Sequence, residues 1–85
     1  MILRITAAAV IGPHELRVTF NNGQTRTVDL ANELHGPVFE PLRDADYFSR
    51  VELDSVCGTV VWPNGADFAP EVLWDLARTE QAAQS

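Results

Sequence analysis

The stretch "HELRVTFNNGQTRTVDL", residues 14–30, decides the fold that we predict for this chain. Apolar and polar residues alternate on both sides of its Asn-Asn-Gly triplet, as in two half-buried strands joined by a tight turn. A two-residue loop would place the apolar Leu16 opposite Asp29. A three-residue loop, with Gly23 in the left-handed conformation, instead places Leu16 opposite Val28. We therefore expect an antiparallel hairpin with the three-residue loop, because it pairs core residues with core residues.

A second hairpin, an N-terminal strand and a helix complete the predicted fold. The segment "VELDSVCGTVVW", residues 51–62, gives a hairpin whose four-residue loop pairs Leu53 with Val60. The segment "LRITAAAVIG", residues 3–12, reads as a strand, and "PEVLWDLARTEQAA", residues 70–83, as a C-terminal helix. We predict an α+β fold of about five antiparallel strands, in two hairpins plus the N-terminal strand, with one face packed by the C-terminal helix.

The remaining segments give local details of this single domain, residues 1–85. Helical turns are expected at 38–43 and 45–49, with Asp44 as the N-cap of the second turn. The ordered core is expected over about residues 2–79, with a frayed tail at 80–85 where the apolar pattern ends. The apolar stripe of the C-terminal helix is predicted to contain Val72, Leu73, Leu76 and Ala77.

The composition excludes several functions. Twelve acidic residues and six arginines give a net charge of −6, and the chain contains no lysine. The lack of lysine excludes Schiff-base chemistry and a P-loop, and the acidic balance argues against nucleic-acid binding by this chain alone. An acidic surface is compatible with simple solvation or with a basic protein partner. No segment approaches the ~20 apolar residues of a membrane span, and Cys57 has no second cysteine to pair with, so we expect a cytoplasmic protein.

Asp67 is the carboxylate whose surroundings raise the question of catalysis. It lies between an Asn64-Gly65 turn and a helix that Pro70 begins. An aspartate at this position accepts a hydrogen bond from the amide of Ala69 and complements the helix dipole. We therefore interpret Asp67 as a helix cap rather than as a reactive group.

No other residues form a recognisable catalytic, metal or cofactor motif. His14 and His35 are far apart in sequence, and each lacks a second ligand at short spacing. Asp44 and Asp46 alone are a weak signal for magnesium. Cys57 has no neighbouring His or Arg in sequence to lower its pKa. We therefore predict a protein that is not an enzyme and holds no cofactor.

The C-terminal helix and the "GPVFEPL" loop, residues 36–42, supply the candidate partner-binding residues. Trp74 lies outside the predicted apolar stripe, so either this loop or a second protein chain is expected to cover its ring. Within the loop, Val38, Phe39 and Leu42 are expected to fill the core, and Glu40 and Arg43 to meet across one turn. The candidate partner-binding residues are Trp74, Arg78, Phe39, Glu40, Arg43 and Trp62.

Three motifs together carry a family resemblance. The segments "GPVFEPL", "GTVVWPNGADF" and "PEVLW" resemble the bacterial family catalogued as domain of unknown function 2442, over residues 2–77. The resemblance implies a small α+β protein for which no activity and no catalytic residues are defined. Short members of this family resemble components of toxin–antitoxin pairs, usually encoded beside another small protein, and longer relatives carry a helix-turn-helix domain after this module.

Three functional hypotheses follow from the residues and the resemblance. The leading one is a non-enzymatic protein-interaction module, the acidic, antitoxin-like member of a two-protein cassette that masks a basic partner, or a homodimer. The first alternative is a DNA-associated transcriptional regulator, which requires arginines clustered on one face. The second is a small-ligand sensor using Asp67, Trp62 and Arg43, which requires a concave pocket.

Overall fold

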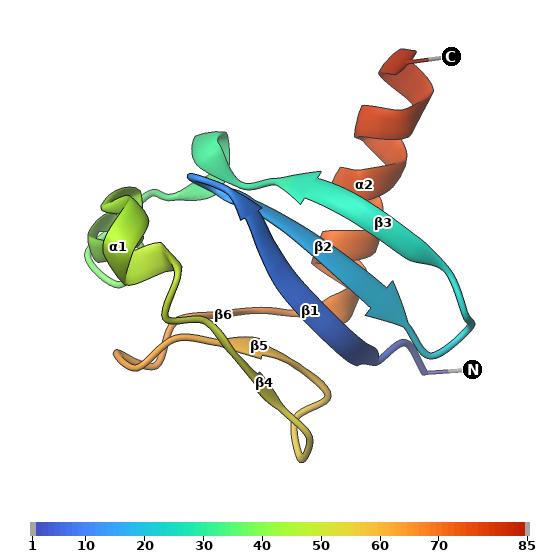
Figure 1. The fold of residues 1–85 in the computed structure, drawn as a ribbon, viewed down its shortest axis with the longest axis horizontal. Coiled ribbons are helices and arrows are strands. Elements are labelled where there is room, and N and C mark those ends of the chain that lie inside the picture. Colours follow the sequence, from blue (N-terminus) through green and yellow to red (C-terminus); the bar gives the residue numbers. More distant parts are fainter. Residues whose placement is uncertain (1, 85) are drawn as a thin grey trace.

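Two three-stranded antiparallel sheets and a C-terminal helix make up the chain (Figure 1). The computed structural model describes residues 2–84, with the side chains of residues 2–77. The first sheet consists of β1 (Ile5–Gly12), β2 (Glu15–Phe20) and β3 (Thr25–Asp29), and the second of β4 (Glu52–Asp54), β5 (Thr59–Val61) and β6 (Asp67–Phe68). The predicted α+β class is confirmed.

The first hairpin has the predicted register. Leu16 lies opposite Val28, and the loop contains three residues. Gly23 has a φ angle of 86°, and its amide donates to the carbonyl of Phe20 at 2.9 Å. The second predicted hairpin is also confirmed, since Leu53 lies opposite Val60 across the β4–β5 loop.

The strand β6 is not among the strands predicted from the sequence. Its two residues are too few to show the alternation that identifies a strand. The Asn64-Gly65 turn before it was predicted correctly, with Gly65 at a φ angle of 90°. This turn has the same hydrogen-bond pattern as the first hairpin loop. The amide of Trp62 donates to the carbonyl of Ala66, and the amide of Gly65 donates to the carbonyl of Trp62, each at 2.9 Å. The "W-P-N-G" turn therefore closes a third hairpin, and the structure has six strands in two sheets.

The predicted capping role of Asp67 is wrong. Asp67 lies within β6, opposite Val61, and its carboxylate accepts no hydrogen bond from the amide of Ala69 within the described residues. Ala69 itself occupies the cap position, since its carbonyl accepts from the amides of Val72 at 3.0 Å and Leu73 at 3.1 Å. The spacing of residues along the chain does not show that Asp67 belongs to a strand.

Short helical turns connect the two sheets. They are η1 (Ala31–Glu33), η2 (Glu40–Arg43) and α1 (Ala45–Phe48). The predicted cap at Asp44 is confirmed, because its carboxylate accepts from the amide of Asp46 at 3.0 Å. None of the helices in residues 2–84 has the length and apolar character needed to cross a membrane.

The helix α2 (Pro70–Gln84) begins at Pro70, as predicted, and its buried stripe agrees with the prediction at Leu73, Leu76 and Ala77 but not at Val72. Pro70, Leu73 and Ala77 are buried and Trp74 packs beside them, whereas Val72 is 43% exposed. The apolar spacing allows two overlapping stripes, one with Val72 and one with Trp74. The second is the one observed, because it buries the much larger indole ring. The frayed tail predicted for residues 80–85 stays a prediction.

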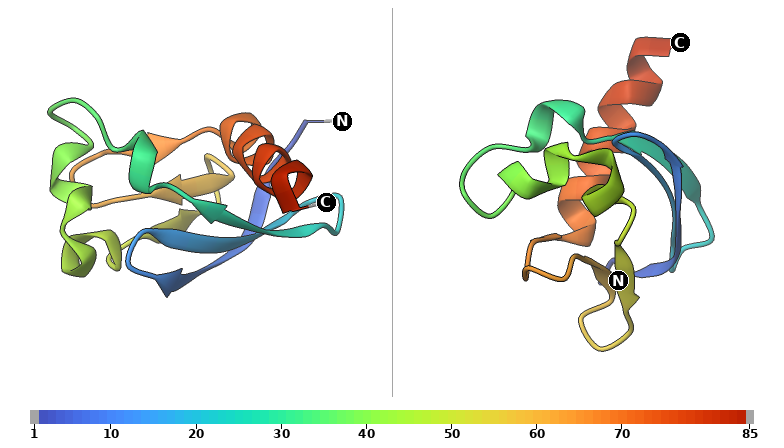
Figure 2. Two further views of the ribbon diagram at one scale, coloured as in Figure 1. Left: turned by 90° about the horizontal axis from the view of Figure 1, so that it is seen from above. Right: turned by 60° about the vertical axis from the view of Figure 1, so that its left-hand side comes forward.

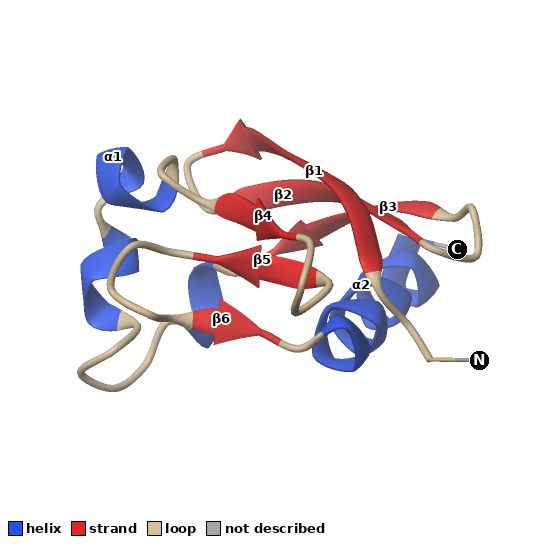
Figure 3. Cartoon of the chain, turned by 90° about the horizontal axis from the view of Figure 1, so that it is seen from below, coloured by secondary structure: helices blue, strands red, loops and turns tan. Residues whose placement is uncertain are grey.

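The hydrophobic core lies between the two sheets and under α2 (Figure 2). The strand β1 contacts β4 and β5 as well as β2, and the amide of Ile5 donates to the carbonyl of Gly58 at 2.7 Å. Figure 3 shows β1 bending across from the first sheet towards the second. The largest fully buried side chains come from both sheets, the segment between them and α2: Phe20, Phe48, Leu16, Leu30, Leu34, Leu42, Leu73, Val18, Val28 and Val60.

Candidate partner-binding surface

Trp62 belongs to the core and not to the surface. Its side chain is 2% exposed, and its indole N–H donates to the carbonyl of Phe48 at 2.9 Å. Its ring also packs against Phe48 and Phe68, with centroid distances of 5.4 and 5.9 Å. The prediction that Trp62 binds a partner is therefore wrong, since β6 and α1 enclose it. A ligand sensor built around this ring loses its main element for the same reason.

Trp74 is covered by the first sheet, which neither sequence-based expectation included. Its ring meets Phe20 edge to face, with centroids 5.0 Å apart, and the guanidinium of Arg26 lies 5.2 Å from the ring centroid. The side chain is half-buried, so part of the ring remains at the surface. The side chain of Arg78 lies outside the described residues, and its role stays a prediction.

The "GPVFEPL" loop is braced against its neighbours. Phe39 is half-buried and its ring centroid lies 5.0 Å from that of Phe68, while Leu42 is fully buried. Val38 is 49% exposed rather than part of the core, but its carbonyl accepts from the side-chain amide of Asn64 at 2.8 Å. This bond links the loop to the β5–β6 turn.

Glu40 and Arg43 do not form the predicted ion pair within the described part of the chain. Arg43 instead donates from Nε to the carbonyl of Leu34 at 2.9 Å, and its own carbonyl lies 2.7 Å from Nε2 of His14. Glu40 is exposed. Of these two candidates, Glu40 remains accessible to a partner, whereas the guanidinium of Arg43 holds the loop in place.

The described arginines are dispersed and occupied. Four of them make intramolecular contacts: Arg4 with the carbonyls of Ser55 and Val56, Arg26 with the ring of Trp74, Arg43 with the carbonyl of Leu34, and Arg50 with the ring of Tyr47. Arg17 is exposed on β2. Phosphate binding needs several basic side chains on one face, and these contacts hold the arginines on separate elements.

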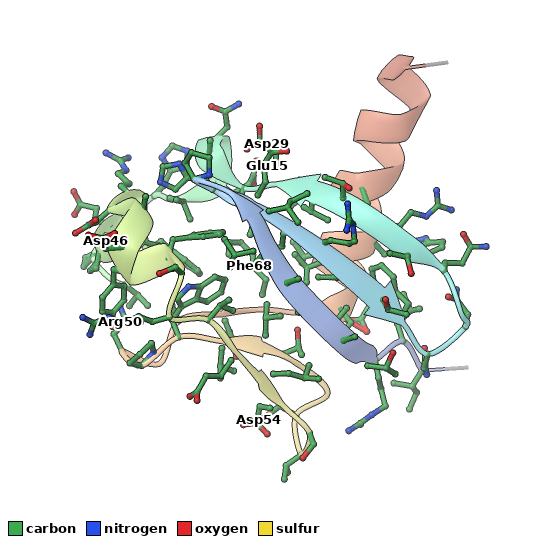
Figure 4. All side chains as sticks on the ribbon, viewed as in Figure 1. Glu15, Asp29, Asp46, Arg50, Asp54 and Phe68 are labelled. Atoms are coloured by element: carbon green, nitrogen blue, oxygen red, sulfur yellow. The ribbon has the colours of Figure 1, made fainter. Side chains whose placement is uncertain are left out.

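The β4–β5 loop contains Asp54 and the exposed Cys57 (Figure 4 labels Asp54). The carboxylate of Asp54 accepts from the amides of Val56 at 2.9 Å and Cys57 at 3.1 Å. The amides of Cys57 and Val56 lower the pKa of Asp54 below its usual value. The negative charge of Asp54, together with partial desolvation, raises the pKa of the Cys57 thiol, which opposes thiolate formation. No group of three or more His, Cys, Asp or Glu side chains comes together as a metal site among the described residues.

None of the helices in residues 2–84 covers the outer face of the first sheet (Figures 1 and 2), and β2 and β3 place threonine and charged side chains on that face. The hydroxyls of Thr19 and Thr25 are 3.0 Å apart on this face. At one end of the sheet, Glu15 lies directly opposite Asp29 in the β2–β3 register, and Figure 4 shows the two carboxylates together. The carboxylate of Asp29 also accepts from the amide of Ala31 at 2.9 Å, and Arg17 lies on the same face beside this pair, opposite Thr27.

Comparisons with known proteins give the family of this chain. The model of the family described as "Protein of unknown function (DUF2442)" matches residues 5–79. The chain belongs to the DUF2442 family. This confirms the resemblance seen in the "GPVFEPL", "GTVVWPNGADF" and "PEVLW" segments. No functionally curated protein matches this DUF2442 chain.

A solved structure resembles the whole DUF2442 chain. It is the crystal structure of a protein from Nitrosomonas europaea described as a "Putative DNA Binding Protein", with 28% sequence identity and a TM-score of 0.81. The match covers 98% of this chain but 53% of the other, so the DUF2442 chain spans about half the length of that protein. The similarity therefore concerns one part of the Nitrosomonas europaea protein.

Proposed function

We propose that this chain is a non-enzymatic protein-interaction module, the acidic, antitoxin-like member of a two-protein cassette that covers a basic partner. The observation that carries the proposal is the excess of accessible acidic side chains over accessible basic ones. The net charge is −6, and four arginines are held in contacts within the chain. Exposed carboxylates, among them Glu40 and Glu52, therefore face few accessible cations of the same chain.

Such a charge distribution favours association with a basic protein in two ways. Long-range attraction raises the rate of encounter, and complementary charges at the interface select the partner. The raised pKa of the Cys57 thiol opposes nucleophilic chemistry at this residue. The mechanism would be steric, with the acidic module lying over the functional surface of its partner.

Co-expression with the small protein encoded beside this chain tests the proposal. We expect a stable complex on size-exclusion chromatography with light scattering, and a dissociation constant that rises when salt is increased from 50 to about 300 mM, because screening weakens charge attraction. If the neighbouring protein is toxic, co-expression should restore growth. The absence of a complex at micromolar concentrations of both proteins would contradict the proposal.

The Nitrosomonas europaea protein supports a second candidate, a DNA-associated regulatory module. In this case the present module would act beside a DNA-binding part rather than hold DNA itself, since its arginines are dispersed. An electrophoretic mobility shift assay with duplex DNA separates the candidates. We expect no shift by this chain alone at micromolar concentration, and a shift by the chain alone would favour the DNA-associated candidate.

A further inference from the structure

Two Asn-Gly pairs, Asn22-Gly23 and Asn64-Gly65, lie in turns of the same geometry. In each turn the glycine amide donates to the carbonyl three residues earlier at 2.9 Å, and the glycine has a positive φ angle, 86° in the first turn and 90° in the second. Each asparagine also accepts a hydrogen bond at Oδ1 from the amide two residues later, that of Gln24 or Ala66, at 3.0 Å. Both asparagines are exposed. The two pairs therefore form a matched comparison within one chain.

The side-chain nitrogens of the two asparagines differ in their contacts. Nδ2 of Asn64 donates to the carbonyl of Val38 at 2.8 Å, so it is bound to a loop from a distant part of the chain. Nδ2 of Asn22 has no hydrogen-bond partner among the described residues, where only Oδ1 of this side chain is bonded. The backbone before Asn64 is also more restricted, because Pro63 fixes its own φ angle whereas Asn21 does not.

An Asn-Gly pair contains both the nucleophile and the electrophile of a deamidation reaction. The amide nitrogen of the glycine attacks Cγ of the asparagine and forms a five-membered succinimide. The side-chain nitrogen leaves as ammonia, and the proton of the glycine amide ends on that leaving group. Water then opens the ring at either of its two carbonyls, which gives aspartate or isoaspartate. Glycine favours the attack because no Cβ atom lies beside the attacking nitrogen.

We propose that Asn22 is a site of spontaneous deamidation in the folded chain and that Asn64 is protected from the same reaction. The hydrogen bond to Oδ1 is common to both sites, so it does not distinguish them. At Asn64, Nδ2 must also leave the carbonyl of Val38 before Cγ can be attacked and ammonia released. One hydrogen bond of ordinary strength changes such an equilibrium by about 3- to 10-fold. This modification is independent of the proposed function, because it requires water and this chain alone.

The two products have different effects on the first hairpin. Aspartate adds one negative charge to the net charge of −6 but keeps an oxygen that can accept from the amide of Gln24. Isoaspartate also inserts a carbon atom into the backbone of the turn, where the amide of Phe20 donates to the carbonyl of Gln24 at 2.8 Å. The adjacent Asn21 holds the N-terminal segment, because its Nδ2 donates to the carbonyl of Ile2 at 2.7 Å. We therefore expect isoaspartate at position 22 to loosen the hairpin tip and lower Tm, and aspartate to leave both nearly unchanged.

Incubation of the folded chain in mildly alkaline buffer at physiological temperature, followed by tryptic digestion and mass spectrometry, tests the inference. The peptides 18–26 and 51–78 contain one Asn-Gly pair each. We expect the first peptide to gain the mass difference between –NH₂ and –OH about 3- to 10-fold faster than the second. Fragment spectra should place the change at Asn22, and labelling by an isoaspartate methyltransferase should detect isoaspartate in the same peptide.

Two controls separate the effect of the fold from that of the local sequence. In about 6 M guanidinium chloride, where the chain is unfolded, the two rates should agree within about twofold, because the contacts that distinguish the sites are lost. Asn22→Ser keeps a side-chain oxygen for the amide of Gln24 but cannot form a succinimide, so peptide 18–26 should lose its fast reaction.

Several results would overturn the inference. Equal rates at the two sites in the folded chain, or a faster rate at Asn64, would contradict the protection by the carbonyl of Val38. A rate difference that persists in guanidinium chloride would assign it to the neighbouring residues in sequence and remove the structural cause. Reaction of both sites in guanidinium chloride but of neither in the folded chain would show that the turn itself protects Asn22.

Discussion

Substitution of Gly58 by alanine tests how the N-terminal segment is fastened to the β4–β5 loop. Gly58 is buried and has a φ angle of 70°, and a Cβ atom placed there lies 2.7 Å from Cζ of Arg4. The guanidinium of Arg4 donates to the carbonyls of Ser55 at 2.8 Å and Val56 at 3.3 Å. Alanine therefore imposes an unfavourable backbone angle and also displaces a side chain that holds the loop.

The two effects have separable magnitudes. A left-handed conformation costs an L residue about 1–2 kcal/mol relative to glycine. Each hydrogen bond lost by Arg4 costs about 0.5–1.5 kcal/mol, with exposed bonds at the lower end. We therefore expect Gly58→Ala to lower the free energy of unfolding by about 2–3 kcal/mol, which corresponds to a decrease in Tm of about 10–20 °C for a domain of this size.

Glycines elsewhere in the chain provide matched controls. Gly23 and Gly36 have φ angles of 86° and 87°, but a Cβ at either position meets nothing within 4 Å. Alanine at these positions should cost only the backbone contribution, about 1–2 kcal/mol. Urea unfolding followed by tryptophan fluorescence measures each variant. If Gly58→Ala is no more destabilising than Gly36→Ala, or if its excess cost persists in an Arg4→Ala background, the clash with Arg4 is not its cause.

Four further predictions test individual residues. Hydrogen bonds to the ionised carboxylate lower the pKa of Asp54, so its contribution to stability is present at neutral pH and is lost as the pH falls below about 4. When the free energy of unfolding is measured at decreasing pH, Asp54→Asn should therefore lose less stability than the unchanged chain. Trp62→Phe should lower the free energy of unfolding by about 1–3 kcal/mol, because the buried carbonyl of Phe48 loses its hydrogen-bond donor. An unchanged midpoint of urea unfolding would contradict the packing of Trp62. Trp74→Ala should cost about 2 kcal/mol or more in the isolated chain, since its ring packs on the first sheet; normal thermal stability combined with lost self-association would instead assign Trp74 to an interface. Asp67→Ala should change stability by less than about 0.5 kcal/mol, because its exposed carboxylate caps no helix, and a loss above 1 kcal/mol on thermal unfolding would restore the capping role.

The features that the sequence predicted correctly are those whose cause lies within a few residues. The three-residue loop at Gly23 follows from the pairing of Leu16 with Val28, since a two-residue loop would place Leu16 opposite Asp29. The cap at Asp44 and the helix start at Pro70 depend on the chemistry of those residues and their immediate neighbours. Local hydrogen bonding and fixed backbone angles determine such features before the chain is folded.

The candidate site could not be predicted in the same way. Trp62 and Trp74 are both amphipathic aromatic residues, and the sequence alone gives no reason for one to be enclosed and the other half-exposed. The sequence did contain one useful pattern for α2. The i, i+3, i+4, i+7 spacing that defines one side of a helix is present in Pro70, Leu73, Trp74 and Ala77, and it matches the observed buried face. The contacts of the arginines depend on residues that lie up to 52 positions away in sequence, as for Arg4 and Val56.

The sequence by itself determined the strands of the first two hairpins, their registers, the turns and the start of the C-terminal helix, because each depends on alternation or on residue chemistry within one segment. Only the tertiary structure decided that β6 joins β5, that β1 bends to contact both sheets, and that β3 is left as an open edge. Whether a strand is central or at an edge depends on which segment pairs with its second side, and that segment can lie far away in the sequence.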